Sequence, residues 1–335
     1  MESFIQSSWT KKPDETFEVT LRPFQLTEFL GQERLKERLE IFIGAAKKRK
    51  EALGHCLFYG PPGLGKTTLS NILAKEMGAQ LTTSSGPALE KAADLAGILT
   101  NLKEGDFLFI DEIHCLPRNI EEYLYSAMEN FSLDLMIDSG PAARSVQIKL
   151  APFTLVGATT RFGLLSSPMR SRFSFTYRLD YYEPQVLKQI VLRSSQILKV
   201  PIDELGALEI ARRARGTPRI ANHLLRWVRD FVETQGLKSI DKAAANKALL
   251  MLDIDEKGLD EMDKRILRLI IQHHQGGPVG LTTLAVALGE DPLTLSEVYE
   301  PYLIMQGFLK RTPRGREVTK FAYEHLKLNN GDILC

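Results

Sequence analysis

The stretch 60–68, which reads GPPGLGKTT, constrains the fold of this chain more than any other part of the sequence. It matches the pattern G-x-x-x-x-G-K-[ST], with an apolar run before it at 55–59 and a helix-like stretch after it at 66–77. Glycines let backbone N–H groups turn inward around phosphate oxygens, and the N-terminus of the following helix adds partial positive charge. We expect Lys66 to reach the β- and γ-phosphates of a nucleotide and Thr67 to offer a hydroxyl to Mg²⁺.

Short strand-like segments at 55–59, 81–84, 106–110 and 153–158 alternate with helix-like stretches at 32–50, 66–77, 89–102 and 120–130. This order predicts an α/β fold, in which helices cover both faces of a mostly parallel sheet. Between 133 and 150 the apolar residues alternate with polar ones on either side of a turn cluster at 138–141. We expect an inserted β-hairpin there, and the pattern leaves open whether it is a buried meander or a projecting arm that binds a partner.

The chain becomes strongly helical after Tyr182, with predicted helices at 185–199, 203–215, 217–235 and 239–252. A polar break at 253–258 follows, then helices at 260–274, 280–288 and 293–305 and two short strands around 308–312 and 316–319. Helices followed by two strands are typical of a winged helix. We therefore expect three domains: an ATPase domain at 1–182, a small helical domain at 183–253 and a winged-helix domain at 254–335.

Composition narrows the class of protein without naming a function. The 335 residues are 44% hydrophobic and 25% charged, which is ordinary for a folded globular protein. The sequence has no secretory signal and no apolar run near the ~20 residues of a membrane helix, and its three cysteines form no CxxC motif. These features favour a cytoplasmic protein without a zinc site. A net charge of +1 excludes a globally basic nucleic-acid coat but allows a local basic patch.

Two carboxylates, Asp111 and Glu112, follow the apolar run 107–110 at the strand end where α/β proteins bind ligands. Asp111 would hold Mg²⁺ through water, and Glu112 would polarise the water that attacks the γ-phosphate. Alone, such a pair could equally cap a helix, but the phosphate loop favours hydrolysis. A third run, 153–158, ends in Thr159 and Thr160, either of which could contact the γ-phosphate or the water.

Three groups of arginines complete the candidate residues. Arg170 and Arg172 could stabilise charge on the transferring phosphoryl group, in a ring from the neighbouring subunit, or could simply form salt bridges. Arg219, at a helix start after residues 215–218, could reach a nucleotide. The segment 306–320 has a net charge of +4, which fits contacts with DNA phosphates or a solvated surface hairpin.

Together these segments resemble the AAA+ ATPases and, more closely, the RuvB family of bacterial Holliday-junction branch-migration motors. The resemblance extends from about residue 21 to 316, and its most specific segments are GTPRIANHLL and QGFLKRTPRGR. The sequence departs from the family pattern at three positions where many members carry basic residues: Cys115, Trp227 and Pro292.

The resemblance implies a role for individual residues. It assigns the catalytic roles to Lys66, Asp111, Glu112 and, as the arginine finger, Arg172. Mg²⁺ would be held by Thr67 and Asp111. Nucleotide contacts would come from Leu21, Arg22, Gly63, Gly65, Lys66, Thr67, Thr68, Glu129, Asn130, Phe131, Thr159, Tyr182 and the sensor 2 residue Arg219. DNA would be contacted by Arg311 and Arg316, and a RuvA-like partner by the hairpin residues Leu135, Ile137, Val146 and Ile148.

The function implied is that of an ATP-driven motor that uses Mg²⁺, assembles as a homo-hexamer and pulls duplex DNA from a four-way junction. A RuvC-like resolvase is a further partner compatible with the resemblance, and no membrane association is expected. Two other classes were weighed. A protein unfoldase should carry an aromatic pore loop, and residues 87–97 contain no aromatic side chain. An ATP-switched transcription regulator should bind one fixed DNA sequence.

Overall fold

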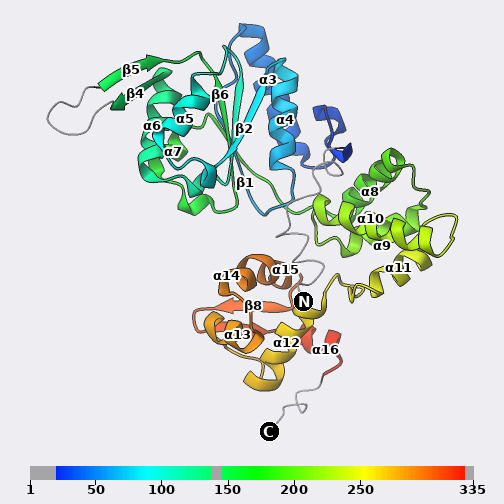
Figure 1. Ribbon diagram of the computed structural model, residues 1–335. Coiled ribbons are helices and arrows are strands. Elements are labelled where there is room, and N and C mark those ends of the chain that lie inside the picture. The colour runs from blue at the N-terminus through cyan, green and yellow to red at the C-terminus, as the bar shows by residue number, and fades with distance from the viewer. Residues whose placement is uncertain (1–19, 137–144, 329–335) are drawn as a thin grey trace. The chain divides into compact units, whose positions relative to one another are not determined.

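A five-stranded parallel sheet forms the centre of the first part of the chain (Figure 1). The computed structural model describes residues 20–136 and 145–328, which divide into two units after residue 182. The strand order is β2-β3-β6-β1-β7. The strands are β1 (Cys56–Tyr59), β2 (Leu81–Ser85), β3 (Phe107–Asp111), β6 (Thr154–Thr159) and β7 (Phe175–Arg178). The α/β fold class is thereby confirmed. Edge strand β7 was not predicted, because its half-exposed sequence FTYR gives no apolar run.

Helices cover both faces of this sheet (Figure 1). One face carries α3 (Glu33–Arg49) and α4 (Lys66–Met77), and the other carries α5 (Ala92–Leu99), α6 (Arg118–Asn130) and α7 (Ser167–Ser171). Successive strand side chains point to opposite faces, so alternate residues such as Leu108 and Ile110 pack under α5 and α6. Both faces are therefore buried at the centre of the sheet, which explains why β1, β3 and β6 appear in the sequence as apolar runs.

Helix α5 is shorter than the stretch 89–102 predicted for it. It begins after Lys91, which is extended and whose backbone N–H donates to Oδ2 of Asp94, and it ends at Leu99. Apolar periodicity continues beyond both ends because Leu89 and Leu102 are buried in the same core. Burial outside the helix therefore lengthened the predicted element.

The segment 132–149 forms the predicted hairpin from β4 (Ser132–Met136) and β5 (Ser145–Lys149). It is a separate two-stranded sheet and extends away from the parallel sheet (Figure 1). Leu133 and Leu150 at its base are buried in the core. Val146, further along the arm, is 41% exposed. The hairpin is thus a projecting arm anchored at its base and not a buried meander, while its binding of a partner stays a prediction.

The second unit begins with four helices and continues as a winged helix. The first four helices are α8 (Pro184–Leu198), α9 (Glu204–Arg213), α10 (Pro218–Thr234) and α11 (Lys242–Leu250). The winged helix comprises α12 (Glu261–His274), α13 (Leu281–Leu288), α14 (Pro292–Thr294), η5 (Leu295–Tyr299), α15 (Glu300–Met305), the strands β8 (Leu309–Thr312) and β9 (Gly315–Val318), and α16 (Lys320–Leu326). The last helix was not predicted. In the described part of the chain, no helix is long and apolar enough to cross a membrane.

The stretch 293–305, predicted as one helix, is divided into α14, a π-helical turn η5 and α15. Pro301 has no backbone N–H and cannot continue the regular hydrogen-bond ladder. The wider π-turn immediately before α15 accommodates this interruption. Apolar spacing alone could not show the break, since Leu295, Tyr299 and Leu303 are all buried on one side.

Candidate nucleotide-hydrolysis site

The phosphate loop connects β1 to α4, and its backbone conformation requires glycine. Gly60, Gly63 and Gly65 all have positive φ, at 135°, 76° and 101°. A Cβ at Gly60 would collide with the carbonyl oxygen of Leu179, and one at Gly65 would lie 3.1 Å from the Phe29 ring. Gly65 also caps the N-terminus of α4. The loop is therefore a cradle of backbone groups at a helix N-terminus, as the motif predicts.

Lys66, the first residue of α4, is buried and turned back over this loop. Its Nζ donates hydrogen bonds to the carbonyl oxygens of Gly60, at 2.8 Å, and Pro61, at 2.9 Å. Burial lowers the pKa of Lys66, while the nearby carboxylates of Glu112 and Asp111 act in the opposite direction. These carboxylates favour the ammonium form, so the acidic pair offsets part of the effect of burial on Lys66.

The acidic pair stands at the carboxyl end of β3, between β2 and β6 in the sheet. Asp111 ends the strand and its Oδ1 accepts a hydrogen bond from the backbone N–H of Glu112, at 3.0 Å. Glu112 has a φ of 45°, and this left-handed turn directs the chain away from the strand immediately after Asp111. The two carboxylates therefore occupy different positions, one continuing the strand and one at the turn.

A carboxylate oxygen of Glu112, Oε2, accepts hydrogen bonds from Thr160. The Oγ1 of Thr160 donates at 3.1 Å and its backbone N–H at 3.3 Å. Thr159 points elsewhere: it is fully buried, and its Oγ1 lies 2.8 Å from Nδ1 of His114 and accepts the backbone N–H of Arg161. Of the two threonines that the sequence left open, Thr160 therefore contacts the Glu112 carboxylate and Thr159 contacts His114. The contact of Thr159 with nucleotide stays a prediction.

His114 belongs to the site although the sequence analysis gave it no role. Its Nδ1 lies 3.2 Å from Oε2 of Glu112 and 2.8 Å from Oγ1 of Thr159. Burial lowers the pKa of His114, with Glu112 raising it and Arg161 lowering it. Its place two residues after Glu112 was the only signal in the sequence. The ring connects the turn after β3 with the end of β6.

Tyr182 is the last residue of the first unit and contacts the phosphate loop. Its hydroxyl donates a hydrogen bond to the carbonyl oxygen of Leu64, at 3.1 Å, and burial raises the pKa of that hydroxyl. Leu21 is buried and Arg22 is half-buried at the beginning of the same unit. Tyr182 thus contacts the loop backbone directly, which agrees with its expected place near the nucleotide.

Arg172 lies in a second cluster, on α6 and α7. Its Nη2 is 3.0 Å from Oε1 of Glu129, its Nη1 donates to the carbonyl oxygen of Pro168, and its guanidinium lies 4.4 Å from the Tyr125 ring centre. Arg170 instead faces the ring of Phe162. Within one chain, Arg172 therefore forms the salt bridge that the sequence analysis had considered as its alternative role.

The three residues of the neighbouring segment 129–131 differ in burial. Glu129 and Asn130 are exposed at the end of α6. Phe131 is partly buried in the core, where its ring packs near those of His55 and Phe153. The side chain of Phe131 is therefore a core residue in this structure, and Glu129 is the member of the segment that contacts Arg172.

Arg219, the predicted sensor 2 residue, is the second residue of α10. Pro218 occupies the first position of that helix, where a missing N–H costs nothing. The predicted position of Arg219 at a helix start is thus confirmed within the second unit.

The two arginines of the wing that were predicted to contact DNA differ in exposure. Lys310, Arg311 and Arg314 are exposed on and between β8 and β9. Arg316 is only 7% exposed, and its Nε and Nη2 make a bidentate pair with Glu300, at 2.6 and 3.1 Å. Because its guanidinium is buried and paired, Arg316 fixes the wing to α15 and is not placed to bind phosphate.

The expected partner residues of the hairpin also differ from one another. Val146 is exposed, whereas Ile148 is partly buried against the core. Leu135 pairs with Val146 in the β4–β5 register, and Ile137 lies outside the described residues. Val146 is thus placed on the surface of the arm, and Ile148 supports its base.

The structure places all three residues that depart from the family pattern. Trp227 donates from its indole Nε1 to the carbonyl oxygen of Ala248, at 2.8 Å, and so joins α10 to α11. Pro292 is the first residue of α14, a position that suits proline. Cys115 is exposed, with its Sγ 3.5 Å from Nε2 of His114.

Comparisons with known proteins cover nearly the whole chain. Three family models match in succession: a Holliday junction DNA helicase RuvB P-loop domain at 21–179, a RuvB AAA lid domain at 182–255 and a RuvB C-terminal winged helix domain at 256–327. The chain is 64% identical over 324 residues to the Holliday junction branch migration complex subunit RuvB of Protochlamydia amoebophila, with 97% of both chains covered. It is 59% identical over 322 residues to the same subunit of Parabacteroides distasonis, covering 96% of this chain and 94% of that one.

A solved structure gives the same result. The structure of the Thermotoga maritima RuvB Holliday junction branch migration motor is 51% identical, with a TM-score of 0.83, and the match covers 92% of this chain and 99% of that one. The fold, the phosphate loop and the arrangement of segments are thus similar to those of known proteins along almost the entire length.

Proposed function

This chain belongs to the RuvB family, the P-loop ATPases that drive Holliday junction branch migration, and from that premise we propose how its residues perform the work. The family decides against the protein unfoldase and the transcription regulator that the sequence alone left open. We propose domain limits of 1–182, 183–253 and 254–335 for the ATPase, lid and winged-helix parts.

ATP is proposed to bind in the phosphate loop with Mg²⁺. Backbone N–H groups of the loop and the ammonium of Lys66 bind the phosphates, and the hydroxyls of Thr67 and Thr68 stand at the start of α4. Thr67 and Asp111 offer a hydroxyl and a carboxylate, the hard oxygen donors that suit Mg²⁺. No cluster of three or more His, Cys, Asp or Glu side chains that could hold a metal occurs among residues 20–136 and 145–328. Mg²⁺ bound there would complete its shell with phosphate and water and would neutralise charge on the phosphates.

Glu112 is proposed to orient and polarise the attacking water. One of its oxygens accepts two hydrogen bonds from Thr160, so the carboxylate is held in one orientation. The observation that carries the proposal is this convergence of Lys66, Asp111, Glu112 and Thr160 at the carboxyl ends of β1, β3 and β6. It assembles a cation, a metal donor and a water-orienting base in the places that phosphoryl transfer needs.

Arg172 is proposed to act on the ATP of the next subunit in a homo-hexameric ring. Its salt bridge with Glu129 is partly exposed and can be exchanged for contact with a phosphate. Sequence resemblance supports Leu21, Arg22, Tyr182 and Arg219 as further nucleotide contacts. Loss of the γ-phosphate contacts on hydrolysis would then change the positions of lid and neighbouring subunit.

The exposed basic residues of the wing are proposed to contact the phosphates of duplex DNA, which suits a motor that moves along any sequence. The β4–β5 arm is proposed to bind a RuvA-like junction-recognising protein, and a RuvC-like resolvase would act on the same junction. Because chromosomal four-way junctions are the substrate, we place the working complex in the cytoplasm.

The test is dissociation of a synthetic four-way junction by the purified chain, with and without ATP, Mg²⁺ and the RuvA-type partner. We expect ATP-dependent dissociation, and none with Lys66→Ala. Mixed rings of Lys66→Ala and Arg172→Ala subunits should regain hydrolysis at interfaces where an intact loop meets an intact arginine. Absence of recovery at every mixing ratio would contradict action of Arg172 in trans.

A further inference from the structure

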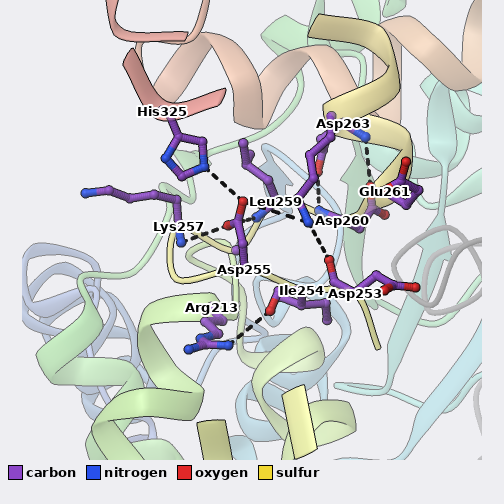
Figure 2. Close-up of polar contacts among 12 residues, drawn as sticks. Arg213, Asp253, Ile254, Asp255, Lys257, Leu259, Asp260, Glu261, Asp263 and His325 are labelled. Atoms are coloured by element: carbon purple, nitrogen blue, oxygen red, sulfur yellow. Dashed lines mark hydrogen bonds and ion pairs between the residues drawn. The ribbon is translucent and has the colours of Figure 1, made fainter. Parts of the chain in front are cut away.

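The linker between the four-helix lid and the winged helix is folded into a turn by one carboxylate. Asp255 accepts hydrogen bonds from the backbone N–H groups of Lys257, at 2.9 Å, and Leu259, at 3.0 Å (Figure 2). Its other oxygen lies 2.9 Å from Nε2 of His325, on the last helix of the winged helix. Lys264 donates to the carbonyl oxygen of Asp253. The segment is thus part of the folded structure and not an open tether.

Arg213, the last residue of α9, fastens the start of this linker to the lid. Its Nη1 donates to the carbonyl oxygen of Ile254, at 3.0 Å (Figure 2). Its Nη2 donates to Oε1 of Glu209, at 2.6 Å, and to Oδ1 of Asn246 on α11. The side chain is almost fully buried. One guanidinium therefore connects two lid helices with the first linker residues.

Arg215 makes the corresponding contacts with the winged helix itself. Its Nε donates to the carbonyl oxygen of Gly258, at 3.0 Å, and its Nη2 pairs with Oδ2 of Asp263. The guanidinium lies 4.6 Å from the ring centre of Tyr302 on α15. A planar, delocalised cation can stack and donate in its plane at the same time, which an ammonium cannot do. Arg215 therefore contacts the linker, α12 and α15 together.

The carboxylate that Arg215 contacts also begins α12. Asp260 and Asp263 form a capping box, each accepting the other's backbone N–H, at 3.0 and 2.9 Å (Figure 2). Both are buried. A change in the position of Arg215 would therefore act on the N-terminus of the first helix of the winged helix.

Arg215 and the sensor residue Arg219 stand on the two sides of one tight corner. Arg215 and Gly216 both have positive φ, at 52° and 70°. Thr217 bonds back to the carbonyl oxygen of Ala214 through both its N–H and its hydroxyl. Pro218 then starts α10, so Arg219 follows after a backbone with little freedom. A displacement of Arg219 is thus passed through the corner to Arg215.

Stability alone is a weak reason to keep such a pair, because buried ion pairs often add little over apolar contacts. Within the described residues, Nη1 of Arg215, Oδ2 of Asp260 and Oδ1 of Asp263 are buried without a hydrogen-bond partner. An imperfectly satisfied buried network calls for another explanation than stability. The direction of the contacts, from a sensor corner to the DNA-binding domain, supplies one.

We infer that Arg215 is a positioning residue that couples the nucleotide state read by Arg219 to the winged helix, through Gly258, Asp263 and Tyr302. This inference rests on the proposed function, since it concerns how hydrolysis becomes movement of DNA. Arg215 does not contact nucleotide or DNA in this scheme. Its loss should separate hydrolysis from movement without abolishing either ATP binding or DNA binding.

The experiment compares Arg215→Lys with wild type and with Arg212→Lys in the full chain. Arg212 is exposed near the end of α9, three residues before Arg215, and is the matched control. The quantities measured are nucleotide affinity, duplex affinity, ATP hydrolysis without DNA, and ATP hydrolysed per four-way junction dissociated. For Arg215→Lys we expect both affinities and the DNA-independent hydrolysis to stay within about twofold of wild type. The ATP hydrolysed per junction dissociated should rise about tenfold or more, which corresponds to a typical coupling free energy. Arg212→Lys should change none of them.

Two outcomes would overturn the inference: an unchanged ratio of ATP to junctions, or a parallel fall in all four quantities, which would indicate only a structural role. Asp263→Asn keeps the shape of the capping side chain and should raise the same ratio; it replaces Arg215→Lys if that variant does not fold. The double variant should be no worse than either single one, because both remove one contact. A wild-type chain that dissociates no junction would refute the proposed function instead.

Discussion

Two arginines of this chain face a carboxylate in very different surroundings. Arg172, on α7, has a side chain 19% exposed beside a Glu129 side chain that is 52% exposed. Arg215, at the corner between α9 and α10, is 2% exposed beside an Asp263 that is 0% exposed. Exposed pairs contribute about 0–1 kcal/mol, whereas removing one partner of a buried pair costs about 3–5 kcal/mol. The first pair can therefore be exchanged for another anion, and the second is a permanent part of the fold.

This comparison teaches that the chemistry of an arginine does not reveal its role; its exposure does. Arg316 with Glu300 repeats the buried case in the wing, and the exposed Arg311 repeats the free case. Changes at exposed arginines should alter activity or binding while the fold persists. Removing the charge of a buried arginine should lower the stability of the fold first. The following experiments, in order of expected effect, test this distinction between exposed and buried arginines.

The largest effect is expected from Arg172→Ala. An arginine finger contributes about 10³–10⁵-fold to turnover, so we expect at least about a 10³-fold fall in kcat for ATP hydrolysis. Nucleotide affinity should be unchanged, and the thermal unfolding temperature should move little, because Glu129 remains half-exposed to water when its partner is lost. Arg170→Ala is the control and should retain most hydrolysis. Turnover within tenfold of wild type for Arg172→Ala would remove it from the catalytic group.

The next effect concerns stability. Arg316→Met leaves Glu300 buried without its partner, and we expect the winged helix to lose about 3–5 kcal/mol of unfolding free energy. Hydrogen exchange of β8, β9 and α15 in the full chain measures this directly. Adding Glu300→Leu should restore much of the protection, because no unpaired charge remains. If the single variant has normal protection but binds duplex DNA weakly, Arg316 contacts DNA and is not a structural anchor of the wing.

A smaller effect is expected at two adjacent threonines, Thr159 at the end of β6 and Thr160 directly after it. Thr160→Val removes a hydrogen bond to the Glu112 carboxylate, worth about 1.5–3 kcal/mol, and should lower kcat about 10–100-fold with unchanged stability. Thr159→Val leaves the backbone N–H of Arg161 without its acceptor and should lower the unfolding temperature. Single-turnover hydrolysis and thermal melting of both variants separate these effects. Interchanged results would show that the exposed and buried roles are assigned the wrong way round.

The smallest effect is expected from Arg311→Ala. One lost phosphate contact should weaken duplex binding similarly for all sequences and reduce the slope of log K against log salt by about 1. Stability should not change, in contrast to its cross-strand neighbour Arg316. Titrations of a fluorescent duplex at several salt concentrations measure the slope. An unchanged slope would exclude Arg311 from the DNA interface.

Much of the fold was predictable because its signals are local. The three central strands of the parallel sheet, β1, β3 and β6, are apolar runs, since both faces of the sheet are covered there. The helices of the lid follow from apolar periodicity and from caps such as Asp203 and Asp241. Strand β7 escaped prediction because an edge strand needs little apolar surface, and the π-turn in 295–299 escaped because it leaves the apolar spacing intact.

The candidate site was predictable at the level of motifs and not of single side chains. Lys66, Asp111 and Glu112 lie where the phosphate loop and the strand end place them. The choice between Thr159 and Thr160 depended on which face of β6 the last side chains occupy. The participation of His114 depended on the left-handed turn at Glu112. Neither feature has a composition or spacing of its own.

By itself the sequence determined the phosphate loop, the acidic pair and the order of the three domains, because glycine conformations, strand ends and apolar periodicity are properties of neighbouring residues. Only the tertiary structure decided which arginines are free and which are anchors. Residues 172, 215, 311 and 316 are the same amino acid in similarly polar segments. Their burial depends on carboxylates that the fold brings from distant positions, such as Asp263 and Glu300, and the energy of a charge pair depends above all on its exclusion from water.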